Sequence, residues 1–196
     1  MLNVVVFGAP CSGKGTQSQK IAALYNLIHV STGELFRDEI KRQTAIGKLA
    51  QTFIDKGELI PDKIVLKEIY RKVIKNNHNR GIVFDGFPRT EHQSMMLEKS
   101  LKKRNLSISL VIYMDVEEDE LINRLNNRNK NSERSDDSFE ILKKRIAIYK
   151  EQTLPLLKYY NDKLILIKIS GMAPADKVFS DISEAIDKFN VKNLGG

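Results

Sequence analysis

Short apolar runs alternate with longer stretches of helical periodicity along the whole chain. The runs predict buried strands at residues 2–7, 27–30, 81–85, 109–115 and 164–169. The stretches between them predict helices at residues 14–25, 32–43, 48–56, 62–76, 91–104, 118–128, 137–159 and 175–189. Strands and helices that alternate in this way predict an α/β fold, in which helices cover both faces of a parallel sheet.

Polar residues precede several of the predicted helices. Ser31, Asp62 and Thr90 each stand directly before or at the start of a helical pattern. Their side-chain oxygens can accept hydrogen bonds from the free N–H groups of the first turn. We therefore expect these three residues to cap their helices.

A glycine-rich loop joins the first predicted strand to the first predicted helix. Residues 8–17 read GAPCSGKGTQ and fit the pattern G-x-x-x-x-G-K. Small residues let consecutive N–H groups turn toward a phosphate at a helix N-terminus, and Lys14 then reaches the β and γ phosphates. Gly15 replaces the usual Mg²⁺-binding hydroxyl, so a metal ion would depend on waters and on a carboxylate elsewhere. The alternative is a strand-to-helix turn that binds nothing.

Two further polar motifs follow predicted strands. Residues 31–37 read STGELFR and place Arg37 about one turn inside a helix, whereas residues 85–90 read DGFPRT. Asp85 closes a buried strand, where its carboxylate can hold the water shell of Mg²⁺. Ligands of parallel sheets bind at the carboxyl ends of the strands, so the three motifs predict one site. Taken alone, Arg37 and Asp85 could each be ordinary surface residues.

Length and cysteine content narrow the class of protein. The 196 residues with 41% hydrophobic content predict one core. The single cysteine excludes an internal disulfide framework and a cysteine-rich zinc site, and it indicates a reducing compartment. Because no apolar run is long enough for export or membrane insertion, we expect a cytoplasmic protein with no membrane partner.

The net charge of +7 suits a polyphosphate partner. Many lysines lie on polar helix faces, which argues against nucleic acid as the main partner. The arginines stand beside loops or in runs of like charge, and guanidinium is suited to bidentate phosphate binding. These arginines are Arg37, Arg89, Arg124, Arg128, Arg134 and Arg145.

Together the motifs resemble the nucleoside monophosphate kinases, and among them the adenylate kinases. The resemblance is carried by residues 8–17, 31–37 and 85–93 and by the arginine-rich segment 124–145, in the family's order and over nearly the whole chain. It implies a P-loop fold with a five-stranded parallel sheet. It also implies reversible transfer of the γ-phosphoryl group of ATP to AMP, with Mg²⁺, to give two ADP.

The resemblance also assigns residues. Those implied for ATP are Cys11, Ser12, Gly13, Lys14, Gly15, Thr16, Arg124, Arg128 and Gly171. Those implied for AMP are Thr32, Gly33, Arg37, Ile54, Glu58, Leu59, Ile60, Gly86, Phe87, Pro88, Arg89, Gln93, Arg134 and Arg145. The catalytic set would be Lys14, Arg89, Arg124, Arg134 and Arg145, with Asp85 holding the metal through water.

Within the family, Thr32, Thr90 and Gln93 favour AMP as the acceptor. The resemblance further implies an AMP-binding subdomain at about residues 31–73, a short lid at about residues 125–136 and a monomer. The lid leaves no room for the zinc-bearing insertion of long-lid relatives, so no structural zinc is expected. The alternatives are a UMP or CMP kinase of the same fold and a non-catalytic P-loop protein that binds nucleotide or nucleic acid.

Three positions depart from the family pattern, which commonly has glycine at Cys11, Asn129 and Glu133. Asn129 tolerates a left-handed backbone, whereas Glu133 adds a negative charge beside Arg134. For Cys11 two interpretations stand. Its thiol has a depressed pKa and reacts readily beside amide donors and Lys14, or it is a small side chain tolerated in the loop.

Overall fold

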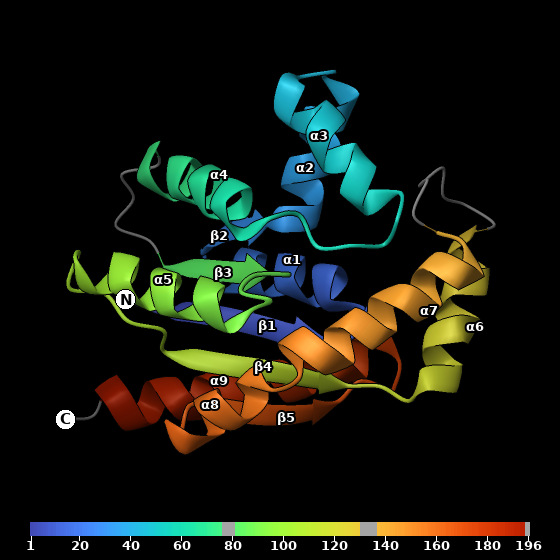
Figure 1. The fold of residues 1–196 in the computed structure, drawn as a ribbon. Coiled ribbons are helices and arrows are strands. Elements are labelled where there is room, and N and C mark those ends of the chain that lie inside the picture. The colour runs from blue at the N-terminus through green and yellow to red at the C-terminus, as the bar shows by residue number, and fades with distance from the viewer. Residues whose placement is uncertain (76–80, 130–136, 195–196) are drawn as a thin grey trace.

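The computed structural model describes residues 1–75, 81–129 and 137–194. Within them, five parallel strands form one sheet in the order β2-β3-β1-β4-β5 (Figure 1). The strands are β1 (Asn3–Gly8), β2 (Ile28–Ser31), β3 (Ile82–Asp85), β4 (Leu110–Asp115) and β5 (Leu166–Ser170). The predicted parallel α/β fold is confirmed. The ends of each predicted strand lie within two residues of the ends of an observed strand.

Residues 4–7 of the central strand β1 form an uninterrupted apolar run, and their packing shows why. Val5 and Phe7 pack on one face of the sheet, in a core that includes Phe84 and Tyr160. Val4 and Val6 point to the opposite face, where they join a second core with residues of helices on that side. Because both faces of the sheet are buried, this part of the strand needs consecutive apolar residues rather than alternating ones.

Helices flank the sheet on both faces. They are α1 (Lys14–Leu24), α2 (Thr32–Lys41), α3 (Ala45–Ile54), α4 (Asp62–Lys75), α5 (Glu91–Lys102), α6 (Glu118–Asn129), α7 (Phe139–Ile148), α8 (Leu156–Asp162) and α9 (Ala175–Leu194). Helices α1 and α9 cover one face, and α5 and α8 pack on the other. Figure 1 shows α2, α3 and α4 grouped on the β2 side, and α6 and α7 at the end toward which the strand arrows point. No helix among residues 1–75, 81–129 and 137–194 is long and apolar enough to cross a membrane.

Two of the three predicted caps are confirmed. The Ser31 hydroxyl accepts from the N–H of Glu34, and the Thr90 hydroxyl accepts from the N–H of Gln93. The prediction for Asp62 is wrong, because Asp62 is the first residue of α4 and the carbonyl of Pro61 accepts the N–H of Val65. The Asp62 carboxylate turns away from its own helix toward donors at the start of α5.

The largest difference from the sequence-based elements lies at residues 137–159. The predicted single helix consists of α7, a π turn at Tyr149–Thr153 and α8. Pro155 has no N–H to donate to the preceding turn, so a regular helix cannot run through it. At the C-terminus the helix is longer than predicted, since α9 continues to Leu194.

Candidate active site

The glycine-rich loop folds back on itself between β1 and α1. The N–H of Ser12 donates to the carbonyl of Ala9 across 3.2 Å, and Lys14 Nζ donates to the same carbonyl across 2.8 Å. Gly13 precedes α1 with a φ of 91°, a left-handed conformation that glycine adopts without strain. The loop therefore presents the N-terminus of α1, with the Lys14 ammonium beside it, as an anion site.

The charge of Lys14 depends on its surroundings. Burial, helped by the nearby cations Arg89 and Arg145, lowers the pKa of Lys14 to about 8, although Asp85 opposes the shift. Three positive groups thus lie close enough to influence one another. Such a cluster becomes favourable once an anion such as a phosphate enters it.

Cys11 occupies a left-handed backbone position, with a φ of 65°. Glycine adopts this conformation more easily than any other residue, which accounts for glycine being common there in the family. Burial raises the pKa of the Cys11 thiol, and this effect exceeds the opposing influence of Arg128, Arg145 and Lys14. The interpretation as a thiol of depressed pKa is therefore wrong, and Cys11 is better described as a small side chain tolerated in the loop.

Asp85 lies at the end of β3, directly beside the loop because β3 pairs with β1. Burial disfavours its ionisation, but His29, Lys14 and Ser31 outweigh that effect and hold the pKa of the Asp85 carboxyl below its usual value. The His29 Nε2 atom lies 3.6 Å from Asp85 Oδ2, and a Cβ built on Gly15 would also lie 3.6 Å from Oδ2. An ionised carboxylate therefore faces the position that lacks the usual P-loop hydroxyl.

This arrangement fits Mg²⁺ bound with a nucleotide. Mg²⁺ is usually held by one or two carboxylates, several waters and the substrate's phosphates rather than by an all-protein cage. Asp85 supplies such a carboxylate. In the described part of the chain, no group of three or more His, Cys, Asp or Glu residues gathers around a possible metal position.

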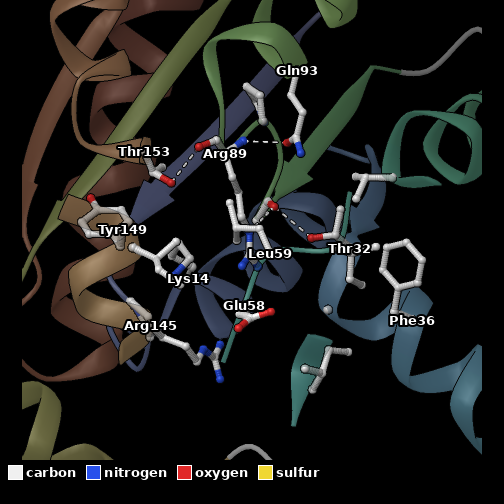
Figure 2. Close-up of a pocket in the computed structure, with 18 of the residues that line it drawn as sticks. Lys14, Thr32, Phe36, Glu58, Leu59, Arg89, Gln93, Arg145, Tyr149 and Thr153 are labelled. Atoms are coloured by element: carbon white, nitrogen blue, oxygen red, sulfur yellow. Dashed lines mark hydrogen bonds between the residues drawn. The ribbon is translucent and has the colours of Figure 1, made fainter. Parts of the chain in front are cut away.

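The turn after β3 fixes Arg89 at several points (Figure 2). Its N–H donates to Gln93 Oε1 across 2.8 Å, and its Nε donates to the carbonyl of Gly86 across 2.7 Å. Gly86 has a φ of 69°, and a Cβ there would meet the Arg89 guanidinium at 2.8 Å. Glycine is therefore required at this position for both the backbone and the arginine.

Thr32 and Gln93, which the family resemblance links to the acceptor base, are tied into the same turn. The Thr32 hydroxyl donates to the carbonyl of Gly86 across 2.9 Å. Gln93 is 2% exposed and donates from Nε2 to Asp62 Oδ1. Because an amide nitrogen carries two hydrogens, this bond does not use up its capacity to donate to a ligand.

A single pocket brings together most of the residues that the resemblance assigns to the acceptor. The predicted residues that line it are Lys14, Thr32, Gly33, Arg37, Ile54, Glu58, Leu59, Ile60, Gly86, Pro88, Arg89, Gln93 and Arg145. Phe87 is not among them, because its side chain is 1% exposed and packs against Phe84 in the core. Sequence reasoning missed Gly57, Ile148, Tyr149 and Thr153, which also line the pocket. No local motif marks these four residues.

Arg124, which the family resemblance assigns to ATP, connects two loops. From α6, its guanidinium donates to the carbonyl of Ser12 across 3.0 Å and to the carbonyl of Gly171 across 2.6 Å. Glu120 accepts from its Nε. The N–H of Gly171 in turn donates to the carbonyl of Asp115 across 2.7 Å. Arg124 thereby fixes the glycine-rich loop relative to the loop after β5.

The segment expected to form the lid is only partly described. Arg128 binds the carboxylate of Asp137, just before α7. Asn129 is the last residue of α6 and is helical, so the left-handed turn considered for it is not observed. Arg134 and Glu133 lie outside the described residues.

Comparison with known proteins agrees with this site. Residues 6–165 match the family model described as adenylate kinase. The chain is 44% identical over 188 residues to the adenylate kinase of Bacteroides thetaiotaomicron, which covers 96% of this chain and 100% of that protein. It is 44% identical over 192 residues to the adenylate kinase of Parabacteroides distasonis, and this match covers 98% of this chain and 100% of that protein. It is 39% identical over 188 residues to that of Flavobacterium psychrophilum, with 95% and 99% covered. Its glycine-rich loop and these matches along nearly its full length place the chain in the adenylate kinase family of phosphotransferases.

Proposed function

We propose that this protein transfers the γ-phosphoryl group of ATP to AMP, reversibly and with Mg²⁺, to give two ADP. The observation that carries the proposal is the convergence of Lys14, Arg89 and Arg145 on one pocket that opens beside the glycine-rich loop. Phosphoryl transfer asks the protein mainly to align two anions and to neutralise their charge. A pocket lined by these three cations and by Arg37, next to a nucleotide-type anion site, meets that demand.

The residues divide between the two nucleotides. The loop from Cys11 to Thr16, together with Arg124 and Gly171, would hold the donor ATP. Thr32, Gly33, Arg37 and the segment from Glu58 to Ile60 line the part of the pocket where AMP would lie. Arg89 and Arg145 stand where the acceptor phosphate and the transferred group would meet. Arg128 would complete the donor side from the lid, and Arg134 would contact the acceptor phosphate and the transferred group.

Bound Mg²⁺ would supply positive charge that offsets the negative charge of the phosphates. Asp85 would hold the ion through its water shell, as its ionised carboxylate beside Gly15 suggests. Lys14 contributes a positive charge on the same phosphates. The protein's own part is thus to orient the donor and to exclude water that would otherwise hydrolyse it.

We assign the AMP-binding subdomain to about residues 31–73 and the short lid to about residues 125–136. The first range contains α2, α3 and most of α4, which Figure 1 shows as a group beside the sheet. Movement of both parts would close the site around the nucleotides. A cytoplasmic monomer that binds only the small-molecule nucleotides is the accompanying proposal, and the single cysteine fits a reducing compartment.

The proposal is tested by mixing the purified protein with ATP, AMP and Mg²⁺ and separating the nucleotides by chromatography. We expect ADP to form only when all three are present, and ATP and AMP to appear when ADP and Mg²⁺ are supplied alone. ATP hydrolysis without dependence on AMP would contradict a transferase. Binding of ATP with no turnover would favour the non-catalytic alternative.

A further inference from the structure

The π turn at Tyr149–Thr153 changes which residues of the α7 arm face the pocket. An α-helix has about 3.6 residues per turn, so residues spaced by four advance slightly more than one turn and drift around the helix. The N–H of Leu154 donates to the carbonyl of Tyr149 across 2.8 Å, an i→i+5 bond that closes a wider turn. From Arg145 to Tyr149 the side-chain direction rotates in one sense around the helix axis. The wider turn from Tyr149 to Thr153 reverses this rotation.

The result is visible in the pocket wall. Arg145, Tyr149 and Thr153 all line the pocket, although a regular helix would turn the last of them away. Figure 2 shows Thr153 directed at the main chain of Arg89. Thr153 is 5% exposed, and its Oγ1 donates to the carbonyl of Arg89 across 2.9 Å. The two residues are 64 positions apart in the sequence, so the bond joins two separate walls of the site.

This bond spans a longer stretch of the sequence than the two bonds that Arg89 makes to Gln93 and Gly86. The bonds to Gln93 and Gly86 lie within the turn that carries Arg89. The bond from Thr153 instead links that turn to the helical arm that carries Arg145. The relative position of the two guanidinium groups decides where a phosphate between them can sit, and small displacements of such groups are costly in phosphoryl transfer.

We propose that Thr153 is a positioning residue for the transfer reaction. Its hydroxyl holds the main chain of Arg89 against the π turn. This contact fixes the position of the Arg89 guanidinium relative to that of Arg145, so that both can bind the acceptor phosphate. The inference rests on the proposed function, because the acceptor phosphate is the group that both arginines bind.

The test compares Thr153→Val, which keeps the shape and removes the hydroxyl, with Thr153→Ser, which keeps the hydroxyl. Ser183→Ala is the control, since the Ser183 hydroxyl in α9 also donates to a carbonyl, that of Phe179, 2.8 Å away. Steady-state rates are measured with ATP and AMP each varied, and melting temperatures are recorded for all variants. If Thr153→Val does not fold, Thr153→Ala takes its place in the comparison with Thr153→Ser.

We expect Thr153→Val to lower kcat/KM for AMP about tenfold, because the Arg89 carbonyl loses the Thr153 donor and the arginine shifts. The KM for ATP stays within about twofold of the wild type, and both Thr153→Ser and Ser183→Ala retain wild-type rates. A lower melting temperature with unchanged AMP kinetics would show a merely structural role and overturn the inference. Equal losses in Thr153→Val and Thr153→Ser would also overturn it, whereas a wild type without turnover would overturn the proposed function itself.

Discussion

Asp62 and Gln93 are joined by a hydrogen bond of 2.7 Å from Gln93 Nε2 to Asp62 Oδ1. A carboxylate only accepts, and the N–H of Arg89, which binds Gln93 Oε1, only donates. These two partners determine which way the amide of Gln93 points. If Gln93 forms hydrogen bonds with the acceptor base, Asp62 contributes to base recognition by orienting the Gln93 amide. Asp62 does so although it does not line the pocket.

Replacing Asp62 by alanine is expected to raise the KM for AMP by about tenfold, because the Gln93 amide loses one of its two fixed partners. The KM for ATP is expected to stay unchanged. His92→Ala is the control, since His92 also contacts Asp62 but has a side chain that is 58% exposed. Steady-state kinetics with AMP varied at saturating ATP measure both, and an equal effect of the two substitutions would count against this role of Asp62.

The lowered pKa of Lys14 predicts that kcat/KM for ATP depends on pH above neutrality. Lys14 binds phosphate only when it is protonated, and its pKa in the ligand-free protein is about 8. The value of kcat/KM for ATP should therefore fall by about tenfold per pH unit above pH 8. Phosphate binding favours the protonated form, so kcat at saturating ATP should fall only at higher pH.

The control for this profile is Lys14→Arg. A guanidinium keeps its charge throughout the range, so its kcat/KM profile should lack the step near pH 8 whatever its absolute rate. A wild-type profile that stays level to pH 9.5 would mean that Lys14 is not the titrating group.

Arg124 is expected to act on the donor nucleotide. Arg124→Lys keeps the charge but cannot reach the carbonyls of Ser12 and Gly171 together, since an ammonium lacks the planar fork. We expect the KM for ATP to rise by about tenfold and the KM for AMP to change little. Arg42→Lys, at an exposed ion pair with Asp38, should leave both constants unchanged. A selective effect on AMP would refute the donor assignment.

Cys11 should react slowly with alkylating agents. Burial raises the pKa of its thiol, so less thiolate is present near neutral pH than in the unfolded chain. Labelling with iodoacetamide at pH 7.5, followed by intact mass, should be slower for the native protein than for the protein in denaturant. Faster labelling of the native protein would restore the interpretation as a reactive thiol.

The strands and the phosphate-facing turns could be predicted because short-range features specify them. A strand such as β1, buried on both faces, leaves a continuous apolar run, and the glycine-rich loop needs small residues at fixed spacing around Lys14. The turn at Gly86 likewise requires glycine for its positive φ. These constraints act within a few residues, so a single sequence displays them.

The remaining features depend on contacts between distant segments. Asp62 does not cap α4 because Thr90, His92 and Gln93, about thirty positions away, present better donors to its carboxylate. The π turn brings Thr153 to Arg89 only once α7 has packed against α6 and α8 has packed against the sheet. Pro155 does carry a local signal that the helix 137–159 must break, but it does not specify a π turn before the break.

The most direct test of the central claim is an acceptor panel. The protein is offered ATP and Mg²⁺ with AMP, UMP, CMP or GMP in turn, and diphosphate formation is followed by chromatography. The account predicts rapid formation of two ADP for each AMP consumed, with much slower turnover of the other three monophosphates. Turnover of UMP or CMP in preference to AMP, or no turnover with AMP, would contradict it.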